Sequence, residues 1–381
     1  MTPVKIVHPV VRTTSVIAGL LIALFAAPGD AGEGSGSGAA LKACAIKTLA
    51  TETPVNHLTI HPASQLVTYT FAGTIGRAGG FRAIDFSTGN ELDALPSRSQ
   101  RYVDMSISPS GRLLAFVQSE KGVSTLRIGK LDGANSKVCT AASAYFRPMA
   151  FSADEKLLLA MSSQGNENRI ILCHASGGMV RSWVNTTLSE RLRESITPRF
   201  HGRPAWMVDS AFFSADAKLL LSTRTDGQLV VWDIDGNRVS ETMVNQYSSG
   251  SSQRRVAFAE DGKVVVINYG STDQRGKTPV IISSLFPEQK RFELLKEPGV
   301  KAALGTDPVS LHSTSQGLYL LLFKPSGVAI VRVLSGETVA EVPLSEPVLA
   351  LGISQDGTML GVAHAGRLTL WRLVKDQEKC A

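Results

Sequence analysis

Short apolar runs and polar turns alternate along most of the chain. One sequence pattern recurs: an apolar run, a turn rich in Ser, Asp and Gly, and a second apolar run. The fourth copy is the clearest, because Asp-Gly pairs at 226–227 and 235–236 supply the positive φ that tight hairpins need. This copy predicts strands at 209–213, 218–223, 228–234 and 238–244. Its Leu-Val-Val-Trp run carries the β-branched and aromatic residues that suit the faces of a sheet.

Seven copies of this sequence pattern follow one another along the chain. They begin 41 to 62 residues apart, at His61, Ser108, Ser152, Ser214, Ala259, Ser313 and Ser354. A period of about 40 to 50 residues with strand-like content is typical of β-propeller blades, because a four-stranded sheet must stack on its neighbours to bury both faces. The pattern therefore predicts an all-β fold, a seven-bladed β-propeller.

The seventh copy ends early, because too few residues follow its strand at 367–374 to form an outer strand. The strand-like segment 41–49 has no blade of its own, and we predict that this region (41–54) closes the last blade and removes two exposed edges. Cys44 and Cys380 would then lie close together, and we predict a disulfide worth roughly 4–5 kcal/mol in the chain-entropy model. For Cys139 and Cys173, a second disulfide and two buried thiols both fit.

The N-terminus has the features of an export signal. Lys5 and Arg12 precede an apolar run at 16–27, and small residues follow at 29–31. As a helix this run would span about 18 Å of a hydrocarbon core of about 30 Å, which favours a signal peptide (1–31) over an anchor. An uncleaved anchor is the alternative, but it would enclose Arg12. We therefore expect a flexible Gly/Ser linker (32–40), a propeller (41–381), no stable membrane span, and a periplasmic or secreted location.

Composition fits one exported domain with many turns, since 43% of residues are hydrophobic and 34 are glycine. The formal charge is +6, but the basic residues are scattered, without the Lys/Arg runs and interleaved aromatic residues that favour nucleic acid. We expect a monomeric ring with no nucleic-acid partner.

One stretch resembles a known family. Residues 221–233, Leu-Ser-Thr-Arg-Thr-Asp-Gly-Gln-Leu-Val-Val-Trp-Asp, look like a WD40 repeat, and residues 366–372 are a weaker version. In that family a turn Asp, a strand Ser and a third-strand Trp join a His in a buried network, which the resemblance places at Asp226, Ser222 and Trp232. No Gly-His dipeptide precedes any copy, so the chain is more similar to exported bacterial propellers of the TolB and YVTN groups. The resemblance implies a binding platform, because these families mostly hold partners on the faces of the ring.

Linear signatures of catalysis are absent from the sequence. It has no Gly-x-Ser-x-Gly elbow, no His-Glu-x-x-His or Cys-x-x-Cys spacing and no phosphate loop, and we expect no cofactor or metal. His57 and His61 would lie about 13 Å apart on a strand, too far for one metal ion, and are interpreted as a loop or surface pair. Propeller enzymes gather catalytic residues from several blades, so a channel enzyme stays open.

The long interval between the third and fourth copies holds a surplus at 181–206. A capping box at 187–190 predicts a short helix over 188–195. The segment combines the arginine and aromatic residues typical of interface anchors. We predict partner binding at Trp183, Arg191, Arg193, Arg199, Phe200, Arg203 and Trp206. The alternative is that the aromatic residues fold back onto the ring and the arginines are solvated.

Charged residues just before the inner strands should converge at the rim of the channel. They are Asp104, Arg147, Asp209, Arg254, Arg255 and Asp307. Their mixed charge could bind a polar ligand or peptide, or could pair locally as a hydrated rim.

The sequence thus favours a non-catalytic exported propeller that acts as a protein–protein interaction platform for an unknown partner. The alternative is a propeller enzyme or enzyme subunit, of lactonase or dehydrogenase type, with its site at the central channel.

Overall fold

The chain divides into two compact units, Met1–Gly38 and Ala39–Ala381. The structure is a computed structural model, and it describes residues 41–51, 55–71, 80–92, 105–131, 135–142, 144–164, 167–185, 208–224, 227–243, 253–259, 263–269, 280–286, 290–295, 309–324, 327–375 and 380. The predicted signal peptide (1–31) and linker (32–40) lie outside these residues. Within them, no helix has the length and hydropathy needed to cross a membrane.

The described elements are β-strands, apart from one 3-10 turn, η1 (Pro62–Ser64). We number the sheets 1 to 7 along the chain by their inner strands. Sheet 1 contains β2 (Val55–His61), β3 (Leu66–Phe71) and β4 (Gly80–Asp85); sheet 2 contains β5 (Met105–Ile107), β6 (Leu113–Glu120), β7 (Val123–Lys130) and β8 (Lys137–Ala142); sheet 3 contains β9 (Tyr145–Phe151), β10 (Leu157–Gln164), β11 (Glu167–His174) and β12 (Met179–Val184). Sheet 4 contains β13 (Val208–Phe213), β14 (Leu219–Arg224), β15 (Gln228–Asp233) and β16 (Arg238–Met243); sheet 5 contains β17 (Gln253–Phe258), β18 (Val264–Tyr269), β19 (Val280–Phe286) and β20 (Lys290–Leu295). Sheet 6 contains β21 (Val309–Thr314), β22 (Gly317–Lys324), β23 (Gly327–Arg332) and β24 (Thr338–Pro343); sheet 7 contains β25 (Ala350–Ile353), β26 (Met359–His364), β27 (Arg367–Lys375) and β1 (Leu41–Ala50).

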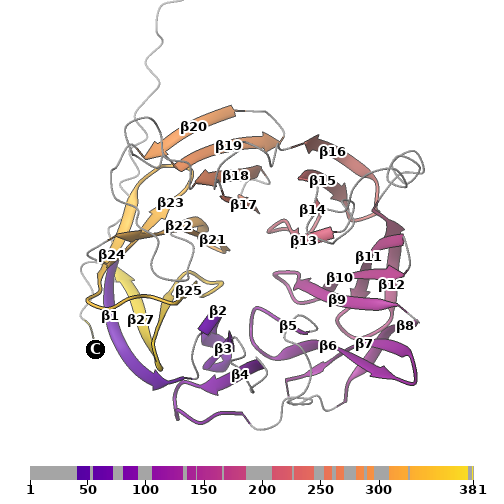
Figure 1. Cartoon of the computed structure of the whole chain (residues 1–381), viewed down its shortest axis with the longest axis horizontal. Helices are drawn as coiled ribbons and strands as arrows, with labels where there is room; N and C mark the ends of the chain where they lie inside the picture. Colours follow the sequence, from indigo (N-terminus) through magenta and orange to yellow (C-terminus); the bar gives the residue numbers. More distant parts are fainter. Residues whose placement is uncertain are drawn as a thin grey trace, which may run out of the picture. The chain divides into compact units, whose positions relative to one another are not determined.

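The described sheets form a closed ring (Figure 1). The inner strands β5, β9, β13, β17, β21, β25 and β2 contact one another in that order. Sheets 1 and 2 are joined by a hydrogen bond between the His61 side chain and the Pro109 carbonyl. Each sheet is antiparallel with its first strand innermost, except that β1 is the outermost strand of sheet 7. The four strands predicted for the fourth copy are present, each within a residue of the expected ends.

The hydrophobic core lies between consecutive sheets rather than inside any one of them. In β10, Leu158 and Ala160 face sheet 2, while Leu159 and Met161 face sheet 4. Successive side chains of a strand point to opposite faces, so a strand that is covered on both faces reads as an uninterrupted apolar run. This explains why the second strands of the copies, such as Leu-Leu-Leu-Ala-Met, show no alternation.

The ring closes as the sequence predicts. In Figure 1, β1 lies along β27, and their antiparallel register runs from Leu41 opposite Lys375 to Ala50 opposite Arg367. A disulfide joins Cys44 to Cys380, with 5.5 Å between the Cα atoms, which confirms that prediction. A second disulfide joins Cys139 in β8 to Cys173 in β11 and settles the pairing that the sequence left open. It links the outer strand of sheet 2 to the third strand of sheet 3.

Candidate functional site

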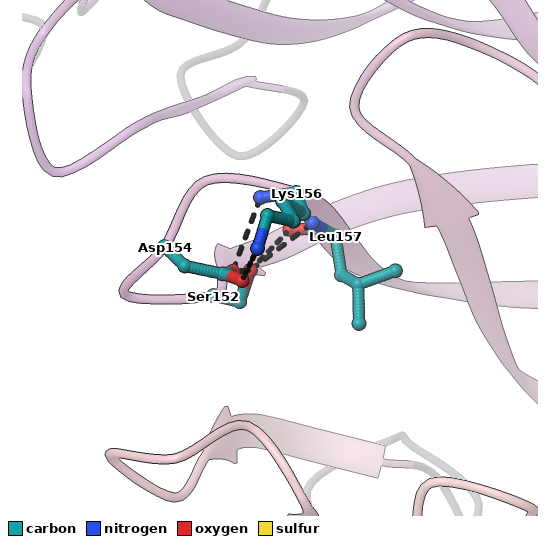
Figure 2. A network of polar contacts seen from close by, with 4 residues as sticks. All are labelled: Ser152, Asp154, Lys156 and Leu157. Atoms are coloured by element: carbon teal, nitrogen blue, oxygen red, sulfur yellow. Dashed lines mark hydrogen bonds and ion pairs between the residues drawn. The ribbon is translucent and has the colours of Figure 1, made fainter.

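The turn between the inner and second strands has a repeated polar structure, which is clearest in sheet 3 (Figure 2). The Ser152 hydroxyl donates to the Asp154 carboxylate at 2.7 Å and accepts the Leu157 backbone N–H at 3.0 Å. The same carboxylate accepts the Lys156 N–H at 3.2 Å. The chain passes through left-handed φ at residue 155. The Ser-x-Asp spacing therefore satisfies backbone N–H groups of the turn from its own side chains, with only Ser152 buried.

The same turn recurs in sheets 4 and 7. Ser214 donates to Asp216 at 2.7 Å, and Ser354 donates to Asp356 at 2.6 Å. The left-handed residue is Ala217 in one and Gly357 in the other, which explains why several copies carry glycine at this position. Sheet 6 differs from the predicted alignment, because Thr314 rather than Ser313 is the buried hydroxyl residue in a tighter hairpin.

In sheets 1 and 2 the turn is held by hydrogen bonds between a side chain and a neighbouring sheet. In sheet 2, the Glu155 carboxylate of sheet 3 accepts hydrogen bonds from the N–H and hydroxyl of Ser110. In sheet 1, His61 replaces the serine and is only 2% exposed. Its Nδ1 lies 3.1 Å from the Pro109 carbonyl oxygen and its Nε2 lies 3.1 Å from the Thr68 hydroxyl. His61 is therefore not the surface residue that the sequence suggested.

The charges of these turns follow from their hydrogen bonds. The Ser152 and Ser214 hydroxyls, as the main cause, hold the pKa values of Asp154 and Asp216 below the usual value. At Asp356 burial opposes the shift, but bonds from Ser354 and Thr358 keep its pKa lowered. Burial is the main cause that lowers the pKa of His61. A neutral ring fits its contacts, since Nδ1–H donates to the carbonyl and Nε2 accepts the Thr68 hydroxyl.

These turns surround a central cavity of about 960 Å³. We call the face of the ring that they form the turn face. All seven sheets contribute to the cavity lining, mostly from the ends of inner strands and the turns that follow. The wall is largely small or apolar, and the Phe212 side chain, 37% exposed, is its most accessible large hydrophobic group. The volume lies in the range of ligand pockets.

The polar part of the cavity wall is mostly hydroxyl and histidine side chains, and it is concentrated in sheet 6. Ser310 and His312 lie two residues apart on β21, so they share the face that lines the cavity, and the Ser310 Oγ is 2.5 Å from the His312 Nε2. His57 and Asp356 also contribute to the lining. Among the described residues, no cluster of three or more His, Cys, Asp or Glu side chains could hold a metal ion.

The predicted rim stays a prediction, although Arg147 is not among the residues that line this cavity. Arg147, Asp209, Arg254 and Arg255 lie in inner strands β9, β13 and β17, and Asp104 and Asp307 lie outside the described residues. In β9 the lining residues are Ala150 and Phe151, at the far end of the strand from Tyr145. The cavity that the structure describes thus belongs to the ends of the inner strands, whereas the sequence argument considered their beginnings.

Of the predicted partner-binding residues, only Trp183 is described. It lies in β12, where its ring packs 6.0 Å from that of Trp232 in sheet 4 and against Gly236. This packing follows the alternative in which the aromatic residue folds back onto the ring. The short helix predicted at 188–195 and the residues Arg191, Arg193, Arg199, Phe200, Arg203 and Trp206 lie outside the described residues.

Part of the WD40-like network is present in sheet 4. The Trp232 indole N–H donates to the Ser222 hydroxyl at 2.8 Å, and both side chains are buried. Asp226 lies outside the described residues. Arg238 packs over the same indole ring, 5.1 Å from its centroid.

Sequence reasoning missed the residues that line the cavity. Phe212, Ser310 and His312 follow no linear motif, because the cavity wall is assembled from strands and turns of different sheets. One signal was available: Ser310 and His312 are polar residues with a spacing of two in one strand, which places them on one face.

No protein-family model and no curated protein matches this sequence. Among solved structures, the chain is similar to the β-propeller domain of Cps50 (Swd1) from Myceliophteria thermophila, with a TM-score of 0.53. The match covers 87% of this chain and 99% of that domain at 12% sequence identity, so it is evidence of the fold alone. Together with the sheet order and the closing strand, this likeness shows that the described part of the chain is a β-propeller, as its repeats predict.

Proposed function

We propose that the protein is a non-catalytic platform that binds a protein partner on the turn face. The observation that carries the proposal is the central cavity, which has a largely apolar wall and an accessible Phe212. Aromatic side chains in a desolvated pocket are the usual anchors of protein interfaces. Residues Arg191 to Trp206 belong to the proposal as a second contact region, beyond the described residues.

The proposal includes export to the periplasm or the outside of the cell. Residues 1–31 would be removed as a signal peptide, 32–40 would be a flexible linker, and 41–381 would form a monomeric propeller of the TolB/YVTN-like kind. The two disulfides support an oxidising compartment, because disulfides persist mainly in such environments. Sequencing the N-terminus of the mature protein tests this part directly.

The partner-binding function is tested by crosslinking in intact cell envelopes with tagged full-length protein. We compare the wild type with Phe212→Glu and with Val239→Glu, which places the same charge at an exposed apolar residue of the outer strand β16. We expect a stoichiometric partner that Phe212→Glu loses and Val239→Glu retains, confirmed by reconstitution from purified components. A partner that both variants retain, or no partner at all, would contradict the proposal.

A second candidate is hydrolysis in the cavity, in keeping with the channel enzyme that the sequence left open. The contact between Ser310 and His312 favours it, because a serine hydroxyl beside a histidine nitrogen is the arrangement of an activated nucleophile. An alkyl fluorophosphonate probe distinguishes the two functions. Labelling that disappears in Ser310→Ala supports the enzyme, and absence of labelling rejects this nucleophile.

A further inference from the structure

A second pocket lies on the turn face of sheet 7, beside the place where the two ends of the propeller meet. It has a volume of about 510 Å³, and we call it the seam pocket. Its walls include Leu41 of β1, Phe86 of sheet 1, and Met359, Arg372 and Lys375 of sheet 7. It therefore combines apolar walls with two cations. The central cavity has a different lining, which shares only Pro62 with this pocket.

The pocket lies where other sheets have a turn. In sheets 1, 3, 4 and 6, the residue after the third strand donates its N–H to a carbonyl near the start of the second strand. These bonds are Phe86 to Gln65, Ala175 to Lys156, Ile234 to Lys218 and Val333 to Leu318. Leu373 makes the same bond to Thr358 in sheet 7. After this bond sheets 3, 4 and 6 turn back toward an outer strand, and sheet 1 turns back to a bridge between Ile84 and Glu91, whereas β27 continues to Lys375. The outer strand of sheet 7 is therefore not the continuation of β27 but β1, to which Cys380 is joined through Cys44.

The residue that precedes the N–H donor of this bond has an intramolecular partner in sheets 1 and 6 but no ion pair among the described residues of sheet 7. In sheet 6 it is Arg332, which pairs with Glu337 across the turn at 3.6 Å. In sheet 1 it is Asp85, whose carboxylate accepts the N–H groups of Ser87 and Thr88 in the turn. In sheet 7 it is Arg372, which is exposed. Neither Arg372 nor Lys375 has an ion pair within the described residues.

Asp356, the carboxylate that neighbours the pocket residue Gly357 in the chain, has no ion pair with these cations among the described contacts. Asp356 lies in the turn next to Gly357, and its carboxylate is held by the hydroxyls of Ser354 and Thr358. The pocket thus offers positive charge beside an apolar wall, at a position where the other sheets hold a polypeptide turn. Charge complementarity favours an occupant with a carboxylate, and the proposed platform function, on which this step rests, favours a peptide segment over other amphipathic acids.

We propose that the seam pocket binds an extended segment of a protein partner that carries a carboxylate beside apolar side chains. The carboxylate pairs with Arg372, with support from Lys375, while the apolar side chains cover Met359 and Phe86. The site extends the proposed platform function but is separate from the central cavity. Failure of the Phe212 experiment and failure of this proposal are therefore distinguishable.

The test is selection of a phage-displayed library of random dodecapeptides on the oxidised full-length protein. We expect enriched peptides with Asp, Glu or a free carboxyl terminus next to apolar residues. In fluorescence anisotropy, the most enriched peptide should bind at least tenfold more weakly to Arg372→Gln, and also more weakly to Lys375→Gln. Arg112→Gln removes the same charge from an exposed arginine in the turn of sheet 2 and should leave affinity unchanged. Melting temperatures of the variants check their folding.

Two further arms separate other occupants. The double variant Asp376→Asn with Glu378→Gln removes carboxylates of this chain that follow β27 in the sequence, and a large gain in peptide affinity would show that these carboxylates compete for the site. That gain would still support a carboxylate site. No enriched peptide, or peptides that bind Arg372→Gln as well as wild type, would overturn the proposal. Binding of octanoate in the absence of any enriched peptide would overturn it in favour of a small amphipathic acid.

Discussion

Sheets 4 and 7 have the same four-stranded antiparallel arrangement but are completed in different ways. Sheet 4 is continuous in the chain, and its turn after β15 is held by the Asp233 carboxylate, which accepts hydrogen bonds from Asn237. Sheet 7 takes its outer strand from the other end of the propeller and joins it through Cys44–Cys380, 336 residues apart. A local turn costs little loop entropy, whereas a distant closure costs more. The difference teaches that closure is the step that most needs a covalent link, and that it leaves a pocket where a turn would be.

The largest difference in unfolding free energy should come from the two disulfides, one at the seam of the ring and one between sheets 2 and 3. Replacing Cys44 and Cys380, 336 residues apart, by serine should lower the free energy of unfolding by about 6 kcal/mol in the chain-entropy model, because the loop is long. Replacing Cys139 and Cys173, 34 residues apart, should cost about 3–4 kcal/mol by the same rule. Urea unfolding of both double variants measures this. An equal or reversed order would mean that loop length does not set the contribution of the seam disulfide.

The seam also depends on close packing between sheets 7 and 1. A Cβ atom on Gly352 would lie 2.3 Å from the backbone oxygen of Leu58, which can move only if the two sheets separate. We expect Gly352→Ala to destabilise the protein by about 1–3 kcal/mol. Gly361→Ala is the matched control, because its nearest contacts are the side-chain ends of Leu58 and Ile60 and should cost less. Thermal unfolding compares them, and a milder effect at Gly352 would contradict the packing argument.

The repeated turn offers a smaller test in the same two sheets. Ser214→Ala should cost about 1–2 kcal/mol, because the Leu219 N–H loses its acceptor and Asp216 loses its hydroxyl donor. Ser354→Ala should cost less, since Thr358 still donates to Asp356 at 2.8 Å. Urea unfolding gives the two free energies, and an NMR titration should show the pKa of Asp216 rising toward its usual value in Ser214→Ala. Equal losses would mean that the Thr358 hydroxyl contributes nothing.

The smallest effect concerns pH at the neighbouring sheet 1. Burial lowers the pKa of His61 below 6.5, so the unfolded chain takes up a proton before the folded chain does. The stability that the neutral ring contributes is complete above pH 6.5 and is lost as pH falls from 6.5 toward the folded pKa. The melting temperature should therefore decline more steeply below pH 6.5 in the wild type than in His61→Gln. Parallel pH profiles would show that this ring does not couple folding to pH.

Much of the fold could be predicted because its signals are local. Asp-Gly at 235–236 fixes a hairpin, and a run such as Leu-Val-Val-Trp fixes a strand, whichever sheets lie beside them. The role of His61 could not be predicted in this way. Its burial depends on Pro109 and Thr68, and the carbonyl of Pro109 belongs to another sheet. The cavity residues could not be located in this way for a related reason: both ends of each inner strand lie near the axis of the ring, and the pattern does not say which end leaves an opening.

The sequence by itself determined the repeat, the strands, the need for a closing strand and the meeting of Cys44 with Cys380, because hydrophobic periodicity, turn chemistry and chain length act over short distances or by simple counting. Only the tertiary structure decided that Cys139 and Cys173 pair, that Phe212, Ser310 and His312 line one cavity, and that Arg372 lines the seam pocket without an ion pair among the residues described. Each of these depends on how neighbouring sheets are rotated and spaced around the ring. That arrangement is set by many interlocking side chains between sheets and has no counterpart in the order of residues along the chain.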